Sequence, residues 1–285
     1  MKVAIVGYGF VGKALKYGLK KNTEIFLVDP ILKTHIKDLE NFIPDIIFIC
    51  VPTPMNDDGS QDVSILNSVF SEIKELKSSA LIVLKSTVLP NYINDLENLI
   101  SDIVYNPEFL RERYANEDFI NSDLIVFGGK DKEIKRLAEF YDNHTNCINS
   151  EYKYTDIITA SLIKYSINTF LSTKVVFFNE LYRIFEKSGA ADNWDNFITM
   201  ISTDKRIGNS HMQVPGPDGM LGFGGPCLPK DCNALYTYSK NIGEPFKLLN
   251  NANSINNIIR KKYNSISDRE LDQNINFDID LDSKS

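Results

Sequence analysis

The sequence has no apolar run long enough to cross a membrane and no dense block of basic residues. Its strongly apolar runs, such as Ile46–Val51 and Ala80–Leu84, have the length of strands, whereas a membrane helix needs about 20 apolar residues. Lys and Arg total 31 against 38 Asp and Glu, which gives a formal net charge of −7. Non-specific nucleic-acid binding depends on neutralising phosphates with positive charge. The sequence therefore predicts neither a membrane span nor a nucleic-acid partner.

Cysteine is also scarce, and its spacing matches no disulfide framework. The four cysteines are Cys50, Cys147, Cys227 and Cys232. The first ten residues, MKVAIVGYGF, hold glycines where a secretory signal has its apolar segment. We expect a cytoplasmic protein with reduced cysteines, in which a cysteine with a special role is reactive rather than structural. No metal site is predicted.

Short apolar segments dominate the first half of the 285-residue chain, and most are continuous rather than alternating. They are Lys2–Val6, Glu24–Val28, Asp45–Val51, Leu81–Lys85, Asp102–Tyr105 and Leu124–Phe127. Continuous apolar strands are buried on both faces, as in a parallel sheet covered by helices. Helical patterns such as Val11–Lys20 separate the strands. The pattern predicts an α/β fold, with a Rossmann-like, doubly wound parallel sheet over residues 1–150.

The second half has a different pattern, which predicts a mainly helical domain over residues 151–265. Thr155–Lys187 has a long helical pattern, and a helix of this length usually spans between domains or lies in an interface. The segment Gly208–Pro229 is rich in glycine and proline and is expected to be a loop, followed by a helical pattern over Asn233–Tyr263. Residues 266–285 are polar and acidic and are expected to form a frayed tail or linker.

A glycine motif lies between the first strand and the first helix. The six residues Gly7-Tyr8-Gly9-Phe10-Val11-Gly12 have the G-x-G-x-x-G pattern. In a dinucleotide-binding fold the first glycine permits a tight turn and the second lets the backbone approach a pyrophosphate. The third lets the helix pack closely on the strand. The helix N-terminus then presents N–H groups to the phosphates. The motif predicts a dinucleotide cofactor.

Asp29 ends the second strand, 22 residues after Gly7 (29 − 7 = 22). A carboxylate at this distance accepts hydrogen bonds from the adenosine ribose hydroxyls and repels a 2′-phosphate, which favours NAD over NADP. Lys33 lies close by and weakens this discrimination. The alternative interpretation is a structural glycine turn with an ordinary surface aspartate.

Further motifs follow in order, and with the glycine motif they span nearly the whole chain. They are Cys50-Val51-Pro52-Thr53-Pro54, Lys85-Ser86-Thr87-Val88, Asn106-Pro107-Glu108-Phe109-Leu110-Arg111-Glu112, Lys164-Tyr165-Ser166-Ile167-Asn168 and Gly222-Phe223-Gly224-Gly225-Pro226-Cys227-Leu228-Pro229-Lys230-Asp231. With these motifs the chain resembles the UDP-glucose/GDP-mannose dehydrogenase family. The Leu228–Asp231 ending resembles members acting on UDP-glucose or GDP-mannose rather than on N-acetylated sugars.

The resemblance implies an NAD-dependent oxidation of a nucleotide sugar, with UDP-glucose favoured, at its 6-hydroxyl. The product is a uronic acid for polysaccharide synthesis, and two NAD are reduced per sugar. The second oxidation needs a thiolate, which adds to the aldehyde and leaves a thioester after hydride loss. Cys227 matches the family nucleophile, and Lys230 would favour its thiolate form. The alternative for Cys227, and the preferred interpretation of the other cysteines, is a small buried apolar residue.

The resemblance also assigns roles around this nucleophile. Lys164 would stabilise the developing alkoxide or assist proton transfer, and Asn168, four residues later on the same helix face, would position the sugar oxygen or a water. Asp231 would hold the catalytic water or pair with Lys164. Because its surroundings are apolar, Lys164 needs a partner. The general base for thioester hydrolysis would be Glu108, which must then be partly buried.

Other residues are implied as contacts of the substrate or cofactor. The remaining catalytic candidates are Glu112 and Thr87; the cofactor contacts are Gly7, Gly9, Phe10, Val11, Gly12, Asp29, Lys33, Pro52, Thr53, Thr87 and Lys230; the substrate contacts are Phe109, Leu110, Arg206, Phe223 and Gly224. Arg206 resembles an arginine that family members lend to the neighbouring subunit, so the resemblance implies a homodimer built on the long helix. A permanently charged guanidinium suits a pyrophosphate.

The sequence departs from the family in three places. Arg113 stands where the family usually has glycine, and the loop Asn209–Met220 is longer than expected. The family also has a third domain that grips the nucleotide, of about 100 residues as is usual for a domain. We expect this domain to be lacking. A separate chain could supply it, the substrate could be smaller, or the gene could be decaying.

Two other functions remain open from the sequence. One is a single-step NAD-dependent β-hydroxyacid dehydrogenase, a related class that also sets Lys and Asn four residues apart but has no use for Cys227. The other is a non-catalytic NAD-binding dimer, which would bind cofactor without turnover. The number of NADH formed per substrate separates these functions from the four-electron oxidation.

Overall fold

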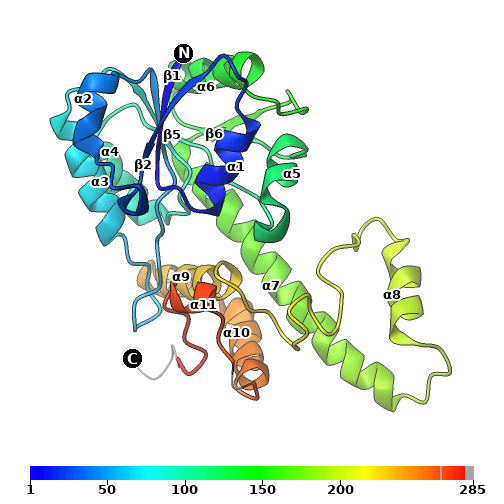
Figure 1. The fold of residues 1–285 in the computed structure, drawn as a ribbon. Coiled ribbons are helices and arrows are strands. Elements are labelled where there is room, and N and C mark those ends of the chain that lie inside the picture. Colours follow the sequence, from blue (N-terminus) through cyan, green and yellow to red (C-terminus); the bar gives the residue numbers. More distant parts are fainter. Residues whose placement is uncertain (264, 280–285) are drawn as a thin grey trace. The chain divides into compact units, whose positions relative to one another are not determined.

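The computed structural model describes residues 1–263 and 265–279, and the chain forms two compact units (Figure 1). The sheet unit consists of Met1–Thr53 and Asp62–Lys164. The helical unit consists of Pro54–Gln61 and the chain from Tyr165 onward. Within the described residues, no helix is both long and apolar enough to cross a membrane.

The sheet unit contains a seven-stranded sheet with the order β2-β1-β3-β4-β5-β6-β7. The strands are β1 (Lys2–Val6), β2 (Glu24–Val28), β3 (Ile46–Ile49), β4 (Leu81–Leu84), β5 (Val104–Tyr105), β6 (Val126–Gly128) and β7 (Lys153–Thr155). Neighbouring strands pair in parallel except β5 and β6, which are antiparallel. The chain moves outward from β1 to β2 and then returns to β3 on the other side of β1. Such a reversal creates the crevice in which open α/β sheets bind ligands.

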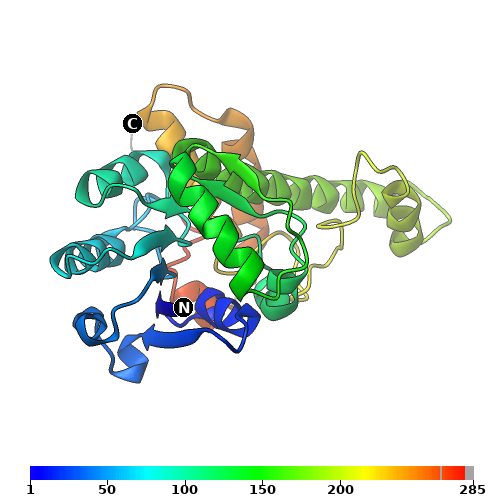
Figure 2. The same cartoon turned by 90° about the horizontal axis from the view of Figure 1, so that it is seen from above.

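Helices cover both faces of this sheet, which confirms the expected α/β fold (Figure 2). One face packs against α2 (Leu39–Phe42), α3 (Ser64–Glu75), α4 (Pro90–Leu99) and the start of α7 (Ile157–Lys187), and the other against α1 (Phe10–Gly18), α5 (Ala115–Ile120) and α6 (Asp131–His144). Short 3-10 turns cover Pro30–Leu32, Ile36–Asp38 and Glu112–Tyr114. Every residue of β3 and β4 is at most 5% exposed, as continuous apolar strands predict.

After the segment Pro54–Gln61, the helical unit resumes at Tyr165 within α7. In the part of the chain that the structure describes, it continues through four further helices. These are α8 (Trp194–Ser202), α9 (Leu228–Asn241), α10 (Lys247–Arg260) and α11 (Asp268–Leu271). The expected single helical pattern over 233–263 is two helices, because Gly243 adopts a positive φ of 84° and Pro245 follows it. Trp194, Phe178, Met212 and Val214 form the buried centre of an apolar cluster in this unit.

Two expected boundaries differ in the structure. The sheet extends past residue 150, because β7 at Lys153–Thr155 pairs with β6. The segment expected to be an acidic tail from residue 266 holds α11, and Ile275 and Phe277 are only 5% and 7% exposed. The end of that expected tail, residues 280–285, lies outside the described residues.

Candidate functional site

The glycine motif forms a tight turn between β1 and α1. Gly7 has a φ of 91°, and its N–H donates to the Val28 carbonyl at 2.8 Å. A Cβ on Gly7 would lie 2.7 Å from the Cys50 carbonyl oxygen, and a Cβ on Gly12 would meet the Gly7 carbonyl oxygen. A Cβ on Gly9 would have no neighbour within 4 Å among the described residues. The turn thus needs two glycines for packing, and the third leaves the N-terminus of α1 open to a phosphate.

Asp29 connects this turn to the end of β2. Its Oδ2 accepts from the Tyr8 N–H at 2.7 Å, and its Oδ1 accepts from the Ile31 N–H at 2.9 Å. Each carboxylate oxygen has a second lone pair for a further donor. The arrangement fits the ribose of a dinucleotide. Lys33, the nearby cation, has a left-handed backbone (φ 55°) and an exposed side chain.

The loops after β3 and β4 are bonded to each other. The hydroxyl of Thr53 donates to the Thr87 carbonyl at 2.9 Å, and the hydroxyl of Ser86 donates to the Val51 carbonyl at 2.7 Å. Pro52 lies between them and is exposed. These contacts fix the carboxyl ends of two neighbouring strands beside the turn of Gly7, where the sequence placed cofactor contacts.

Lys164 and Glu108 form a buried ion pair in the sheet unit. The Lys164 Nζ lies 3.1 Å from Glu108 Oε1, and the two side chains are 4% and 7% exposed. Glu108 Oε2 accepts from the Leu110 N–H at 2.7 Å. The Nζ also lies 5.5 Å from the ring centre of Phe109. Glu108 is therefore the partner that burial of Lys164 requires, and it has the burial expected of a general base.

Lys85 is a second buried lysine of the sheet unit, and the sequence motifs predicted no role for it. The Lys85 Nζ donates to Asn106 Oδ1 at 2.9 Å and to the Asn106 carbonyl at 3.2 Å. The hydroxyl of Tyr141 donates to the same Oδ1 at 2.6 Å. Burial lowers the pKa of Lys85, while Cys50 and Glu108 raise it.

Lys85 also lines a cavity of about 20 Å³ together with Glu108 and Cys147, which is room for about one water. The signal in the sequence is a lysine placed directly after the apolar strand Leu81–Leu84, where a charged group must find buried partners.

Cys227 lies at the N-cap of α9 in the helical unit and is partly exposed. The Asp231 N–H donates to the Cys227 carbonyl at 3.0 Å. Asp231 is 1% exposed, and it accepts from Lys230 Nζ and from Asn168 Nδ2, both at 2.6 Å. A helix N-terminus favours an anionic sulfur. Lys230, predicted to favour the thiolate and contact cofactor, is thus ion-paired with Asp231.

The other three cysteines have surroundings that suit apolar residues. Burial raises the pKa of Cys50 and of Cys232 to about 12. Burial also raises the pKa of Cys147, whose Sγ donates to the Phe119 carbonyl at 3.2 Å. All three are therefore protonated thiols at neutral pH. Across 1–263 and 265–279, no three His, Cys, Asp or Glu side chains group in a way that could hold a metal.

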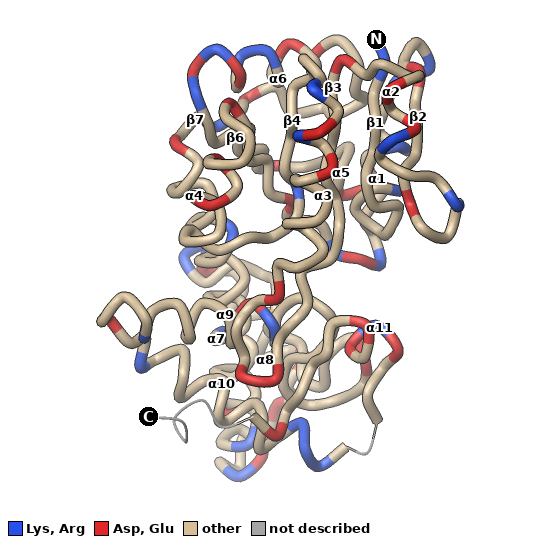
Figure 3. Tube along the Cα trace, turned by 90° about the vertical axis from the view of Figure 1, so that its left-hand side faces the viewer, with Lys and Arg blue, Asp and Glu red and all other residues tan. Residues whose placement is uncertain are grey.

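The remaining candidates are dispersed. Phe109 and Leu110 are half-buried, and Glu112 and Arg113 are exposed. The Arg206 side chain is 89% exposed and pairs with Asp204 at 2.5 Å. Lys and Arg lie interspersed with Asp and Glu along the chain (Figure 3).

Phe223 and Gly224, predicted to contact substrate, lie in the loop before Cys227. Phe223 is 3% exposed, and both its N–H and its carbonyl bond to the Asn256 side chain, at 2.7 and 2.9 Å. Asn256, Arg260 and Glu270 surround this loop, and the sequence analysis did not single them out. For Glu270 a signal existed, because Ser267-x-x-Glu270 is a capping-box pattern.

Comparison with known proteins gives the same domains in the same order. Residues 31–145 match the model of the NAD binding domain of the UDP-glucose/GDP-mannose dehydrogenase family, and residues 158–258 match its central domain. A relative named UDP-glucose 6-dehydrogenase, from Rickettsia bellii, is 39% identical over 202 residues. That match covers 68% of this chain and 45% of the relative. The chain thus spans about half the length of such relatives.

Solved structures with the same fold include a UDP-glucose dehydrogenase from Pyrobaculum islandicum. Its TM-score is 0.76 at 23% identity, covering 91% of this chain and 68% of that one. The 3-hydroxyisobutyrate dehydrogenase of Mycobacterium tuberculosis aligns with a TM-score of 0.70 at 14% identity, covering 97% and 96% of the two chains. At these identities the likeness concerns the fold alone.

Proposed function

The chain belongs to the UDP-glucose/GDP-mannose dehydrogenase family, and from this premise we propose that it oxidises the 6-hydroxyl of a nucleotide sugar, UDP-glucose, to the carboxylate. The observation that carries the proposal is the contrast among the cysteines. Only Cys227, among the four, lies partly exposed at the N-terminus of a helix within the family's nucleophile motif. A single-step dehydrogenase has no use for such a thiol.

NAD is the hydride acceptor in this proposal. The open backbone at Gly9 and the N-terminus of α1 would hold its pyrophosphate, and Asp29 would accept from its ribose hydroxyls. Because Asp29 is anionic, it disfavours the extra phosphate of NADP. A soluble cofactor and four cysteines that form no disulfide with one another support the cytoplasm as the setting.

In the first oxidation we assign the Lys164 ammonium to the sugar's 6-oxygen. As the hydroxyl loses its proton, the positive charge would stabilise the developing alkoxide. Glu108 neutralises Lys164 in the structure at 3.1 Å, so the pair enters the reaction with no net charge. Asn168, one helical turn after Lys164, would orient the same oxygen while Asp231 fixes its amide.

In the second oxidation the Cys227 thiolate would add to the aldehyde carbon and form a thiohemiacetal. Loss of a hydride from this adduct would leave a thioester on Cys227. Glu108 would then take a proton from a water positioned with Thr87, and the resulting hydroxide would expel the Cys227 sulfur. Overall, one alcohol, two NAD and one water give one carboxylate, two NADH and three protons.

The long helix supports a homodimer. Phe170, Phe177 and Ile184 are seven residues apart on α7 and are 66%, 60% and 64% exposed. Side chains at this spacing lie along one stripe of a helix, and such a stripe is suited to a helix partner. In a dimer, the exposed Arg206 would reach the substrate of the neighbouring subunit.

The decisive experiment counts NADH per sugar. We expect two NADH for each UDP-glucose consumed by the purified chain, because the alcohol loses four electrons on its way to the carboxylate. Cys227→Ala should abolish the second oxidation, while Cys147→Ala, a half-buried cysteine outside the motif, should keep the ratio at two. The measurement is NADH absorbance at completion against residual sugar.

A ratio of one NADH in the unaltered protein would instead support the single-step reaction. Cofactor binding without any NADH, from UDP-glucose or GDP-mannose, would support the non-catalytic dimer. Either result contradicts the proposal.

The dimer has its own test. Phe177→Glu should weaken self-association by about 100-fold, because it removes a large ring that the proposed interface would bury and places a charge there. Ile65→Glu is the matched control, since Ile65 is a 43% exposed apolar residue on α3 of the sheet unit. Sedimentation over a concentration series measures both. Equal association of the two variants would rule out the α7 stripe as the interface.

A further inference from the structure

The loop that precedes Cys227 is held by side chains that bond its backbone. The Gly222 N–H donates to Asn179 Oδ1 at 2.9 Å. The next residue, Phe223, bonds to Asn256 through both its N–H and its carbonyl. The Gly225 N–H donates to Glu270 Oε1 at 2.8 Å. The last of these bonds is the nearest to the nucleophile in the chain, and its acceptor is a carboxylate.

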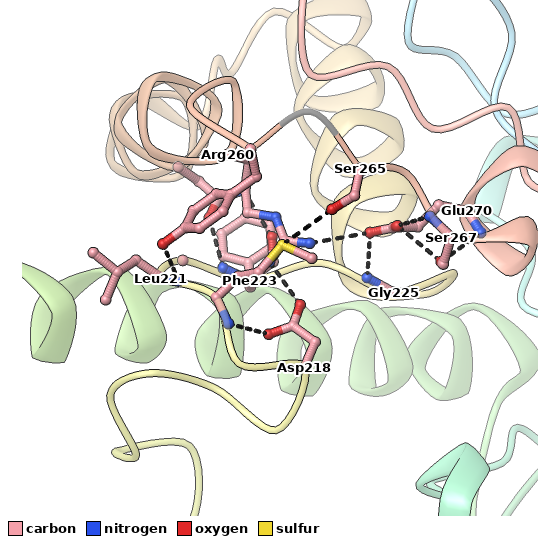
Figure 4. A network of polar contacts seen from close by, with 12 residues as sticks. Asp218, Leu221, Phe223, Gly225, Arg260, Ser265, Ser267 and Glu270 are labelled. Atoms are coloured by element: carbon pink, nitrogen blue, oxygen red, sulfur yellow. Dashed lines mark hydrogen bonds and ion pairs between the residues drawn. The ribbon is translucent and has the colours of Figure 1, made fainter.

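Glu270 is one of the most deeply buried carboxylates of the helical unit. Its side chain is 3% exposed and lies 3.4 Å from Arg260, which is 2% exposed. Its Oε2 accepts from the N–H and the hydroxyl of Ser267, both at 2.8 Å, which closes the capping box of α11. Arg260 also pairs with Asp218 at 2.7 Å (Figure 4). The carboxylate is thus fixed by a helix cap and a buried cation, and it also accepts a hydrogen bond from the loop.

The glycines of the loop are explained by this arrangement. A Cβ on Gly224 would lie 2.7 Å from Arg260 Cζ and 2.8 Å from Glu270 Oε1. A Cβ on Gly222, which has a φ of 76°, would lie 2.5 Å from Asn256 Oδ1. Gly225 has a φ of 80°. Gly224 therefore leaves room for the buried charges and Gly222 leaves room for the Asn256 amide, while Gly225 is required by its positive φ. The glycines thus serve the support of the loop as well as access for a substrate.

The segment after α10 supplies two side chains, Glu270 and Phe277, that contact Arg260. Besides Glu270, it places the Phe277 ring 5.5 Å from the Arg260 guanidinium, and Phe277 is 7% exposed. Sealing a cation–carboxylate pair from water strengthens its attraction. A stretch of sequence that resembles a solvated tail thus contributes to the surroundings of the Cys227 loop.

We propose that Glu270 is a positioning residue for Cys227, holding the loop through the Gly225 N–H so that the thiolate stays in place at the N-terminus of α9. The effect on turnover rests on the proposed function, whereas the effect on the position of Cys227 does not. With the loop held, the aldehyde is captured as a thiohemiacetal. With the loop released, part of the aldehyde leaves before it is captured.

The test uses Glu270→Ala, with Asp268→Ala as its matched control. Asp268 is an exposed carboxylate on the same short helix. Alkylation by iodoacetamide is followed at each cysteine by mass spectrometry. We expect Glu270→Ala to speed alkylation of Cys227 about tenfold, the effect of losing one charge-assisted hydrogen bond of at least 1.5 kcal/mol. Cys232, which is 0% exposed on α9, should keep its slow rate in both variants.

The alkylation rate of Cys232 distinguishes a positioning role of Glu270 from a general loss of stability of the helical unit. If Cys232 and Cys227 speed up together, Glu270 only stabilises the unit, and the proposal is overturned. It is also overturned if Cys227 alkylation is unchanged or slower, or if Asp268→Ala behaves in the same way. None of these readouts requires turnover, so they stand even if the proposed function fails.

A second readout follows the aldehyde. With semicarbazide present as a trap, Glu270→Ala should form fewer than two NADH per sugar, while Asp268→Ala should remain at two. Partial unfolding lowers the rate of both steps equally and leaves this ratio unchanged. A ratio of two in Glu270→Ala, beside a fully active unaltered protein, contradicts the positioning role without touching the proposed function.

Discussion

Lys164→Met is expected to lower the free energy of unfolding of the sheet unit by about 3–5 kcal/mol, the usual result of removing one partner from a buried ion pair. The replacement leaves Glu108 only 7% exposed and without the cation that lies 3.1 Å away. Methionine fills most of the lysine's volume, so a cavity contributes little. Urea titration, followed by circular dichroism, gives the change.

The activity of Lys164→Met should also fall. If the ammonium stabilises the alkoxide, its removal should lower kcat by about 100-fold to 1,000-fold, the effect of losing one donor to a developing oxyanion. Saturating sugar and a temperature far below unfolding separate this effect from the loss of stability. A stable, fully active Lys164→Met protein would exclude the assigned role.

The matched control is Lys130→Met. Its ion pair with Asp102 is shorter, at 2.6 Å, but the two side chains are 63% and 51% exposed. Solvent screens such a pair, which typically contributes less than about 1 kcal/mol. The comparison therefore asks whether burial or distance determines the effect. The double variant Lys164→Met/Glu108→Gln should recover part of the loss, because the amide carries no unpaired charge.

The parts of this site that follow from local pattern could be predicted from the sequence. The turn at Gly7 and the carboxylate at Asp29 depend on a strand, a turn, a helix and a second strand of fixed spacing, and the structure bonds Asp29 to the turn. The burial of Lys164 could be predicted too, since its helix neighbours are apolar. Its partner could not, because Glu108 is 56 residues away and the choice depends on tertiary packing.

The segment after Ser265 in the helical unit shows the opposite case. Few large apolar residues follow Ser265, and average composition therefore predicted a tail. Two of them, Ile275 and Phe277, are nevertheless buried. Glu270 is paired with Arg260, which the sequence pattern placed in a helix but for which it predicted no partner. A polar segment can be ordered by a few specific contacts, and composition averages those contacts away.

Alkaline pH is expected to destabilise the chain in part through one buried thiol of the helical unit. Burial raises the pKa of Cys232 from 9.0 to about 12, so the native state keeps its proton after the unfolded chain has lost it. A group of this kind contributes stability below pH 9 that is lost as the pH rises toward 12. The difference corresponds to about 4 kcal/mol, a large part of the net stability of a domain.

Cys232→Ala removes this term at every pH. Its free energy of unfolding should start lower than that of the unaltered protein at pH 7, because a small cavity costs a constant amount. It should then decline less steeply between pH 9 and pH 11, so that the two curves converge. Urea midpoints under reducing conditions measure both curves. Parallel curves would show that the thiol does not titrate on unfolding.

Cys50 provides the contrast within the same chain. Burial raises its pKa to about 12 as well, yet Lys85 lies close enough to lower it. Burial in turn lowers the pKa of Lys85 below 10.5, so the unfolded chain holds that proton longer and the lysine's contribution to stability rises with pH up to about 10.5. The two groups oppose each other in the sheet unit. Cys50→Ala should therefore make the decline of stability with pH less steep, as Cys232→Ala does. In the sheet unit, however, the decline itself should begin at a higher pH than in the helical unit, because the buried Lys85 ammonium offsets the buried Cys50 thiol.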